Sequence, residues 1–241
     1  TVYELVALGR QPHTGFFGRL NKTDHSIIEE ALEAVSISHK AHSYTAELSD
    51  GERQKVMIAK ALVQECPLIL LDEPTAFLDF PSKVEMMQLL HQLSRQTDKT
   101  IFLSTHDLEL ALQIADKIWL MDKVNGVTIG TPEDLSLNGS LSNFFARKGI
   151  AFDLETGLFR VANEYTSQIR LAGHGQKYAM VRKALQRNGI LANRNVESEI
   201  YIETGDLKGD GSFVFHRPGK EPVTVYSIEK LLQIVLSFHS L

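Results

Sequence analysis

Apolar residues recur every three or four positions in several stretches of the chain, the spacing that places them on one face of an α-helix. The first such face carries Ile27, Ile28, Ala31, Leu32 and Val35. A second predicted helix takes Ser49 as its N-cap, continues through Val56 to Val63 and is closed by Pro67. Pro81 opens a third, whose apolar stripe consists of Val84, Met87, Leu90 and Leu93.

Between these helices lie short runs typical of strands. Leu68 to Leu71 form an unbroken apolar run ending on Asp72, which predicts a parallel strand buried on both faces. Asp98-Lys99 predicts a turn between the third helix and a strand over residues 100–105. A short helix over 107–115 and a strand over 117–121 follow, and Asn125-Gly126 predicts a hairpin turn into a strand over 127–130. This alternation indicates an α/β domain with a mostly parallel sheet.

Beyond residue 149 the pattern changes. It predicts a hairpin over 153–161, strands over 168–172, 199–204 and 212–216, and helices over 176–188 and 227–239. We therefore expect two domains, an α/β domain over 1–149 and a small α+β domain over 150–241. The segment 206–211 has the look of a calcium loop, but Lys208 stands at a ligand position and Arg217 replaces the bidentate glutamate, so a turn is favoured.

Composition narrows the classes of partner. The 241 residues include 25 Lys and Arg against 30 Asp and Glu, and the net charge of -5 argues against nucleic acid as the main partner. The single Cys66 excludes an internal disulfide, suits a reducing compartment and is expected to be a small buried side chain. No apolar run approaches the ~20 residues of a membrane span, so any membrane role is expected to be peripheral. The chain starts at Thr1 rather than Met, as a truncated chain would.

Two carboxylates and a histidine are expected at one edge of the sheet. Asp72 and Glu73 follow a buried strand at its carboxyl end, where α/β proteins bind ligands. Asp72 is suited to holding Mg²⁺ through its water shell, and Glu73 to acting as general base. His106 follows the next strand and would stand at the same edge. The alternatives are a sheet edge with solvated acids and a histidine that only makes structural hydrogen bonds.

His39 and His42 lie three residues apart, a spacing that could grip a metal. Because no carboxylate or cysteine completes a ligand set around them, we interpret both as solvated.

The segments 48–54 (LSDGERQ), 68–74 (LILLDEP) and 104–107 (STHD) occur in an order and spacing that resemble the second half of an ATP-binding cassette (ABC) ATPase. Ser49-Asp50-Gly51 resembles the family's LSGGQ signature, with Asp50 in place of the first glycine and Glu52 in place of the glutamine. The resemblance implies a P-loop NTPase-type cassette that lacks its N-terminal part. The phosphate loop, GxxxxGK[ST], is absent, since the only Gly-Lys pair is Gly219-Lys220, followed by Glu221. The glutamine loop is absent as well.

The resemblance also implies site roles and partners. Ser49, Gly51 and Glu52, at a helix N-terminus suited to anions, would contact the γ-phosphate of ATP held by a second subunit in a head-to-tail homodimer. Asp50 would add a negative charge near that phosphate, which could weaken the contact by up to about 1 kcal/mol if exposed. Asp79 matches the D-loop that communicates across the dimer, and His106 would contact the γ-phosphate. ATP and Mg²⁺ are the implied cofactors.

Within the family, residues 1–10 with Pro12-His13 and the segment 16–20 resemble importer ATPases for ferric siderophores, haem and cobalamin. That implies membrane permease subunits as partners and a peripheral location at the cytoplasmic face of the inner membrane. Phe16-Phe17 is either a permease contact or ordinary core packing. The function expected is that of the ATP-binding and hydrolysing subunit of an ABC importer, inactive as this chain alone. The alternative is a non-catalytic chain that binds or regulates a partner.

Overall fold

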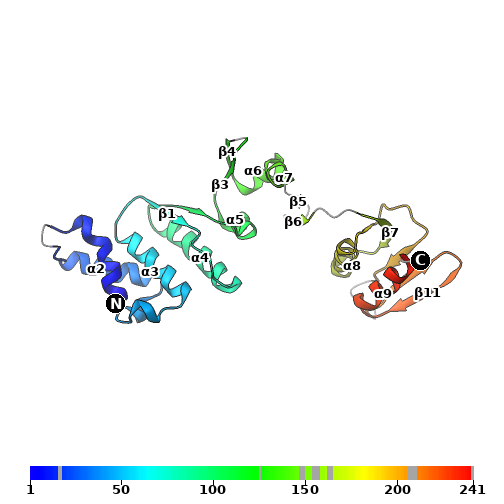
Figure 1. The fold of residues 1–241 in the computed structure, drawn as a ribbon, viewed down its shortest axis with the longest axis horizontal. Helices are drawn as coiled ribbons and strands as arrows, with labels where there is room; N and C mark the ends of the chain where they lie inside the picture. Colours follow the sequence, from blue (N-terminus) through cyan, green and yellow to red (C-terminus); the bar gives the residue numbers. More distant parts are fainter. Residues whose placement is uncertain are drawn as a thin grey trace. The chain divides into compact units, whose positions relative to one another are not determined.

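The computed structural model describes residues 1–15, 18–124, 126–146, 150–153, 158–161, 165–205 and 211–239. They form two compact units, Thr1–Phe159 and Arg160–Leu241 (Figure 1). The boundary expected after residue 149 precedes two short strands, β5 (Ile150–Asp153) and β6 (Leu158–Val161). Contacts assign Phe152 and Phe159 to the first unit, because both pack on its apolar residues.

The first unit begins with helices: α1 (Val2–Ala7), the 3-10 helix η1 (Leu8–His13), α2 (Lys22–Ala34), the 3-10 turns η2 (Ser38–Lys40) and η3 (Thr45–Glu47), and α3 (Asp50–Leu62). The predicted face of α2 is inward, with Ile28 and Leu32 in the core against Val56 and Ile58 of α3. The η1 backbone crosses α3 closely at Gly9, where an added Cβ would lie 2.5 Å from the Lys60 carbonyl oxygen. A glycine is therefore required at this crossing.

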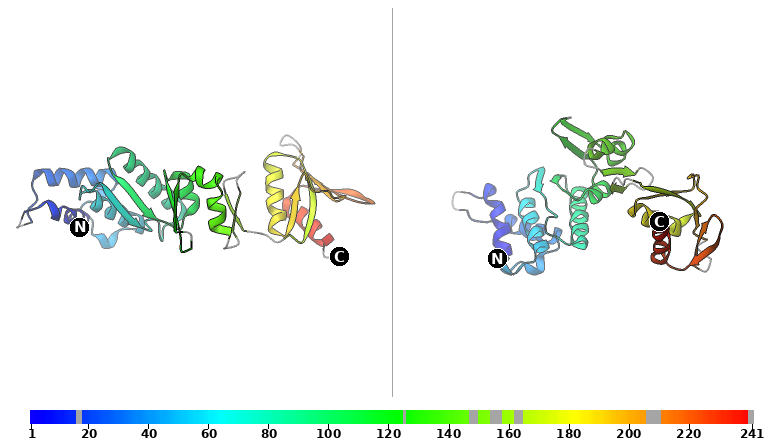
Figure 2. Two further views of the ribbon diagram at one scale, coloured as in Figure 1. Left: turned by 90° about the horizontal axis from the view of Figure 1, so that it is seen from above. Right: turned by 45° about the vertical axis from the view of Figure 1, so that its right-hand side comes forward.

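The sheet of this unit pairs β1 (Leu68–Asp72) with β2 (Thr100–Ser104) in parallel, and the chain between them forms α4 (Phe80–Gln96). The expectation that β1 is buried on both faces is wrong. Ile69 is buried against Met86 of α4, whereas Leu68 and Leu70 on the other face are 48% and 69% exposed. Within the described residues, β1 pairs only with β2, and helices cover one face of the pair (Figure 2).

After β2 the chain forms α5 (Leu108–Ile114), the antiparallel hairpin of β3 (Ile118–Asp122) and β4 (Gly126–Gly130), α6 (Pro132–Leu137) and α7 (Ser140–Ala146). The β3–β4 hairpin was expected from the sequence, although Asn125 of its turn lies outside the described residues. Leu120, Leu135 and Leu141 form a separate small core. The hairpin expected over 153–161 corresponds to β5 and β6, and its turn residues 154–157 likewise lie outside the description.

The second unit is a five-stranded sheet with two helices. Its elements are β7 (Ser167–Ala172), α8 (Gly175–Arg187), β8 (Ile190–Asn193), β9 (Tyr201–Glu203), β10 (Phe213–Arg217), β11 (Lys220–Val225) and α9 (Ile228–His239). The strand order is β11-β10-β9-β7-β8, with β7 parallel to β8 and β9. Its core joins Ile169, Phe215, Leu185 and Leu231 from strands and helices. The sequence missed β8 and β11, and the calcium-like segment falls on residues 206–210, outside the description.

Across the described part of the chain, no helix combines the length and the apolar character that crossing a membrane requires.

Candidate functional site

The parallel pair brings Asp72 and Glu73 to one sheet edge together with the end of β2. Asp72 is in register with Ser104, whose hydroxyl donates to Asp72 Oδ1 at 2.6 Å and accepts from the Glu73 backbone N–H at 3.0 Å. One hydroxyl therefore fixes the carboxylate of Asp72 and the backbone of Glu73. The carboxylate is exposed, and among the described residues its second oxygen accepts no hydrogen bond, which suits a ligand that holds Mg²⁺ through water.

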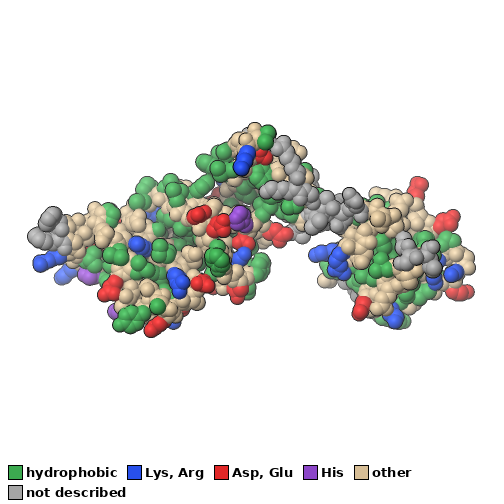
Figure 3. Space-filling model, viewed as in Figure 1, with side chains coloured by type: hydrophobic (Ala, Val, Ile, Leu, Met, Phe, Trp, Pro, Cys, Tyr) green, Lys and Arg blue, Asp and Glu red, His purple; other side chains and the backbone are tan. Residues whose placement is uncertain are grey.

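Glu73 and His106 meet at this edge, as the sequence predicted. His106 Nε2 lies 2.9 Å from Glu73 Oε1, although the side chains are 88% and 45% exposed. Glu73 adopts φ of 46°, in the left-handed region that non-glycine residues rarely occupy, and such conformations cluster at functional sites. In Figure 3 a histidine stands among acidic side chains on the surface of the first unit. The pair is open to solvent and therefore accessible to a ligand.

Asp79 caps a helix in this structure. Its carboxylate accepts a hydrogen bond from the Ser82 backbone N–H at 3.0 Å, at the start of α4. Hydrogen bonds from Ser82 keep the pKa of Asp79 below its ordinary value, so the carboxylate is ionised near neutral pH. The residue two places before it, Phe77, has φ of 64° and is 94% exposed.

Ser49 is the N-cap of α3, as expected, and its hydroxyl is already bonded. It donates to Glu52 Oε2 at 3.1 Å and accepts from the Glu52 N–H at 3.3 Å, while the Ser49 N–H donates to Glu52 Oε2 at 2.9 Å. These bonds form a capping box. The backbone hydrogen bond from Ser49 and further bonds outweigh burial and lower the pKa of Glu52. A phosphate at this helix start would compete with Glu52 for the Ser49 hydroxyl.

The signature residues form a group of their own. A Cβ on Gly51 would first meet Leu78 Cδ2 at 3.9 Å, so the glycine borders the turn that carries Asp79 and has room for a ligand. The neighbouring Asp50 is exposed and lies 3.7 Å from Arg53. Within the described residues, the side chain of Ser49 bonds to Glu52, and its carbonyl accepts a hydrogen bond from the Arg53 N–H at 2.9 Å.

Asp107, which follows His106, was not assigned a role from the sequence. Its carboxylate accepts a hydrogen bond from Thr75 Oγ1 at 2.7 Å and one from Lys83 Nζ at 2.8 Å. Burial opposes ionisation, but the bonds from Lys83 and Thr75 outweigh it and keep the pKa of Asp107 below its ordinary value. The residue thus connects the turn after β2 with the turn after β1.

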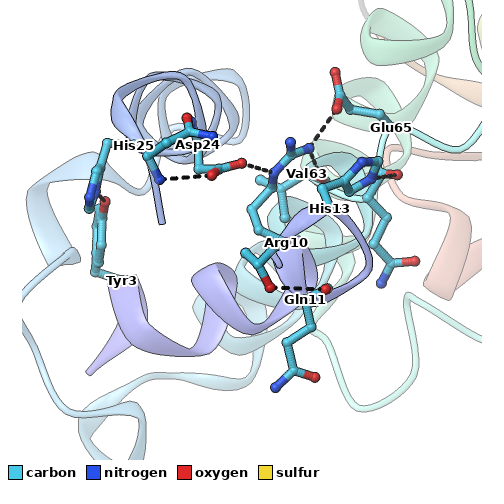
Figure 4. A network of polar contacts seen from close by, with 11 residues as sticks. Tyr3, Arg10, Gln11, His13, Asp24, His25, Val63 and Glu65 are labelled. Carbon is cyan, nitrogen blue, oxygen red and sulfur yellow. Dashed lines mark hydrogen bonds and ion pairs between the residues drawn. The ribbon is translucent and has the colours of Figure 1, made fainter. Parts of the chain in front are cut away.

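Arg10 is the second residue that sequence reasoning missed. It is 5% exposed, and its guanidinium donates to Asp24 Oδ1 at 2.9 Å, to the Val63 carbonyl at 2.8 Å and to Glu65 Oε2 at 2.6 Å (Figure 4). Asp24 itself is 2% exposed and forms a capping box with Asn21 at the start of α2. The network therefore ties η1 and α2 to the end of α3, the helix that begins at Ser49.

The structure also places the other residues that were singled out from the sequence. His39 and His42 are exposed, in agreement with their interpretation as solvated. The described residues contain no group of three or more histidine, cysteine or acidic side chains that could hold a metal by itself. Cys66 is exposed, contrary to expectation, because it lies in the loop between α3 and β1 rather than in the core. Phe16 and Phe17 lie outside the described residues.

Comparison with known proteins finds two families that match this chain. Residues 2–76 match the family described as ABC transporter, and residues 166–236 match the iron ABC transporter C-terminal domain. The chain is 39% identical over 163 residues to an uncharacterised ABC transporter ATP-binding protein, MJ0873, of Methanocaldococcus jannaschii, covering 68% of this chain and 56% of that protein. It is 39% identical over 145 residues to the iron(3+)-hydroxamate import ATP-binding protein FhuC of Bacillus subtilis, covering 60% and 54%.

Among solved structures, the fold resembles a chain of a metal-chelate type ABC transporter in an inward-facing conformation. The TM-score is 0.56 at 32% identity, and the match covers 61% of this chain and 58% of that chain. The chain thus spans a little over half the length of each of these relatives.

Proposed function

Because the chain carries part of an ABC transporter ATPase domain, we propose that it supplies the catalytic carboxylate, the histidine and the signature helix of an ATP-hydrolysing importer subunit. The observation that carries this proposal is the 2.9 Å contact between Glu73 and His106, beside Asp72 at the carboxyl edge of a parallel sheet. A general base needs an accessible carboxylate that water can reach, and Glu73 is one.

Each residue of the edge then has a task. Glu73 takes a proton from the attacking water, and His106 donates a hydrogen bond to the terminal phosphate while its ring stays beside Glu73. Asp72, oriented by Ser104, holds Mg²⁺ through water. The metal, when bound with ATP, supplies positive charge that offsets the charge of the phosphate oxygens.

The phosphate cradle must come from outside these residues, since the sequence contains no GxxxxGK[ST] segment. The exposed apolar face of the sheet supports this part of the proposal. Leu68, Leu70 and Phe102 are 48%, 69% and 38% exposed, and Phe102 contacts Trp119, itself 49% exposed, with ring centroids 5.1 Å apart. An apolar sheet face of this kind is a surface that other protein covers.

The partners follow from the two groups of residues. The start of α3 with Ser49 and Gly51 acts on ATP held by a second copy of the subunit, and Asp79 lies at the contact between the copies. Membrane permease subunits bind the ATPase at the cytoplasmic face of the inner membrane. The solute is an iron siderophore, haem or cobalamin. The name of the FhuC relative and the iron-transporter C-terminal family support an iron complex among these.

The decisive experiment replaces Glu73 with Gln in a protein that joins this chain to a phosphate-loop half. ATP binding should persist while turnover falls by ~10²–10⁴-fold, the usual contribution of a general base. Glu85→Gln, which disturbs only the exposed ion pair with Lys55, is the matched control. Turnover that Glu73→Gln leaves unchanged would remove Glu73 from the base role and favour the alternative, a non-catalytic chain that binds or regulates a partner.

The chain by itself should show no measurable ATP hydrolysis, because removing a single preorganised donor already costs ~2.7–4 kcal/mol and the missing loop supplies several. A coding sequence upstream of the Thr1 codon that contains a phosphate loop would support the importer proposal directly.

A further inference from the structure

We propose that Asp107 is a positioning residue that holds His106 against Glu73. The contact itself is a property of this chain, whereas its importance for ATP turnover rests on the proposed function. Asp107 does not touch the reacting atoms. It acts through the two turns that carry His106 and Glu73.

The contact between His106 and Glu73 is too weak to fix the two side chains by itself. Both side chains are open to water, at 88% and 45% exposure, and even a fully charged pair this exposed contributes only ~0–1 kcal/mol. Rotamer freedom alone would therefore separate His106 from Glu73 for much of the time. A separation of 2.9 Å requires that the backbone beneath the two side chains be fixed by other contacts.

On the histidine side, Asp107 is the centre of a three-residue turn. It has φ of -84° and ψ of 69°, and the Leu108 N–H donates to the His106 carbonyl at 3.0 Å, the pattern of an inverse γ-turn. The Asp107 N–H donates to Thr105 Oγ1 at 2.9 Å. The orientation of Asp107 therefore sets the direction in which the preceding residue, His106, leaves the backbone.

On the glutamate side, Thr75 belongs to the turn that begins at Glu73, where the Ala76 N–H donates to the Glu73 carbonyl at 2.9 Å. Thr75 is 2% exposed, and its hydroxyl donates to Asp107 Oδ2 at 2.7 Å. This hydrogen bond, made under cover from water, joins the turn of Glu73 to the turn of His106.

Lys83 fixes the other carboxylate oxygen of Asp107. Its ammonium lies 2.8 Å from Asp107 Oδ1, and the two side chains are only 27% and 25% exposed. Since Lys83 lies on α4, the carboxylate ties three elements together: α4, the turn after β1 and the turn after β2. Hydrogen bonds to a charged group are the stronger kind, and here both acceptor oxygens are used.

The test measures the pair directly in this chain, without nucleotide. Nuclear Overhauser contacts between the His106 ring protons and the Glu73 γ-protons should be present in the wild type and lost in Asp107→Ala. Asp107→Asn, which can still accept from one partner, should retain weakened contacts. Asp116→Ala, which removes the acidic partner of Arg95 at the surface of the same unit, is the matched control and should keep them.

A merely structural role would lower stability without moving His106 in the molecules that remain folded. A folded Asp107→Ala variant with unchanged contacts, or a wild type without them, would overturn the inference. Should Asp107→Ala fail to fold, Thr75→Val and Lys83→Met each remove one of the two bonds, and each should weaken the contacts. Because no nucleotide is used, a failed Glu73→Gln experiment would reject the proposed function and leave this result standing.

Discussion

Two polar side-chain contacts of the first unit have the same separation and opposite surroundings. Arg10 and Asp24 lie 2.9 Å apart with side chains 6% and 2% exposed, whereas His106 and Glu73 lie 2.9 Å apart at 88% and 45%. Burial of charge is costly, and the Arg10 network meets that cost by bonding several acceptors. The side chains of His106 and Glu73 keep polar atoms in contact with water. One pair is therefore part of the scaffold, and the other is accessible to a ligand.

Removing Arg10 should have the largest effect, because it leaves Asp24 charged and buried without its partner. We expect Arg10→Met to lower the free energy of unfolding by ~3–5 kcal/mol, the range for breaking a buried pair. Urea denaturation followed by the fluorescence of Trp119, the single tryptophan, reports on the first unit. Arg95→Met, which breaks an exposed pair with Asp116, is the control and should change stability by less than about 1 kcal/mol. Equal losses in the two variants would erase the distinction between buried and exposed pairs.

Acid should weaken the buried network. The hydrogen bond from the Asn21 N–H, with the Arg10 guanidinium, lowers the pKa of Asp24 against the opposing effect of burial. A depressed pKa stabilises the fold at pH values above about 3.9, where the unfolded aspartate is ionised, and this stability is lost as pH falls through the folded-state pKa. Urea midpoints measured from about pH 5 to pH 3 should therefore fall less steeply in Asp24→Asn than in the wild type. Parallel pH profiles would show that Asp24 contributes nothing to the acid sensitivity.

The close crossing of η1 over α3 offers a test of the same scaffold without any change in charge. In Gly9→Ala the new methyl group would meet the Lys60 carbonyl and Val63 Cγ2, both at 2.5 Å, so the helices must separate. Overpacking of this kind costs ~1–3 kcal/mol. Gly15→Ala is the control, since nothing lies within 4 Å of its added Cβ. Thermal unfolding of both variants should distinguish them, and a Gly9→Ala midpoint equal to that of Gly15→Ala would contradict the crossing.

The sequence predicted the exposed pair and missed the buried one, for a physical reason. Glu73 and His106 each follow an apolar strand, so periodicity alone places them at one sheet edge. Arg10 sits in a helical stretch and meets Asp24 only because η1, α2 and α3 pack together. The spacing of residues along the chain does not predict a contact such as that between Arg10 and Asp24. The fold itself was largely predictable for the same reason, since most strands and helices have a clear period.

The errors follow the same line. The unbroken apolar run of β1 predicts a strand that is covered on both faces. Whether both faces are covered depends on the elements packed around the whole sheet, which the sequence of one strand does not specify. Burial was expected for Cys66 because free cysteines are usually buried, but Cys66 lies in a loop and is exposed. Asp107 belongs to the segment 104–107 that resembles the ABC family, but nothing in the sequence was a reason to assign it a role. Its partners Thr75 and Lys83 lie far from it in the sequence, and only the folded chain brings them into contact with it.

A smaller effect is expected at the start of α3. Ser49→Ala removes the N-cap and one half of the capping box, which costs ~1 kcal/mol. The control is Ser26→Ala, whose hydroxyl only bonds the exposed Glu30. Urea denaturation should place Ser49→Ala between the Gly9 and His106 variants. A loss as large as that of Arg10→Met would mean that Ser49 belongs to the scaffold more than to a ligand site.

The smallest effect on stability is expected from His106→Ala. The imidazole is 88% exposed, and its contact with Glu73 competes with water, so the free energy of unfolding should change by less than about 1 kcal/mol. Glu73 is left exposed rather than buried, which spares the variant the cost that Arg10→Met incurs. Urea denaturation of the two variants side by side measures the contrast. A loss above about 2 kcal/mol in His106→Ala would show that the pair supports the fold, since surface substitutions stay near zero. A negligible loss would show that the fold does not need the imidazole, as the proposed role of His106 toward a ligand requires.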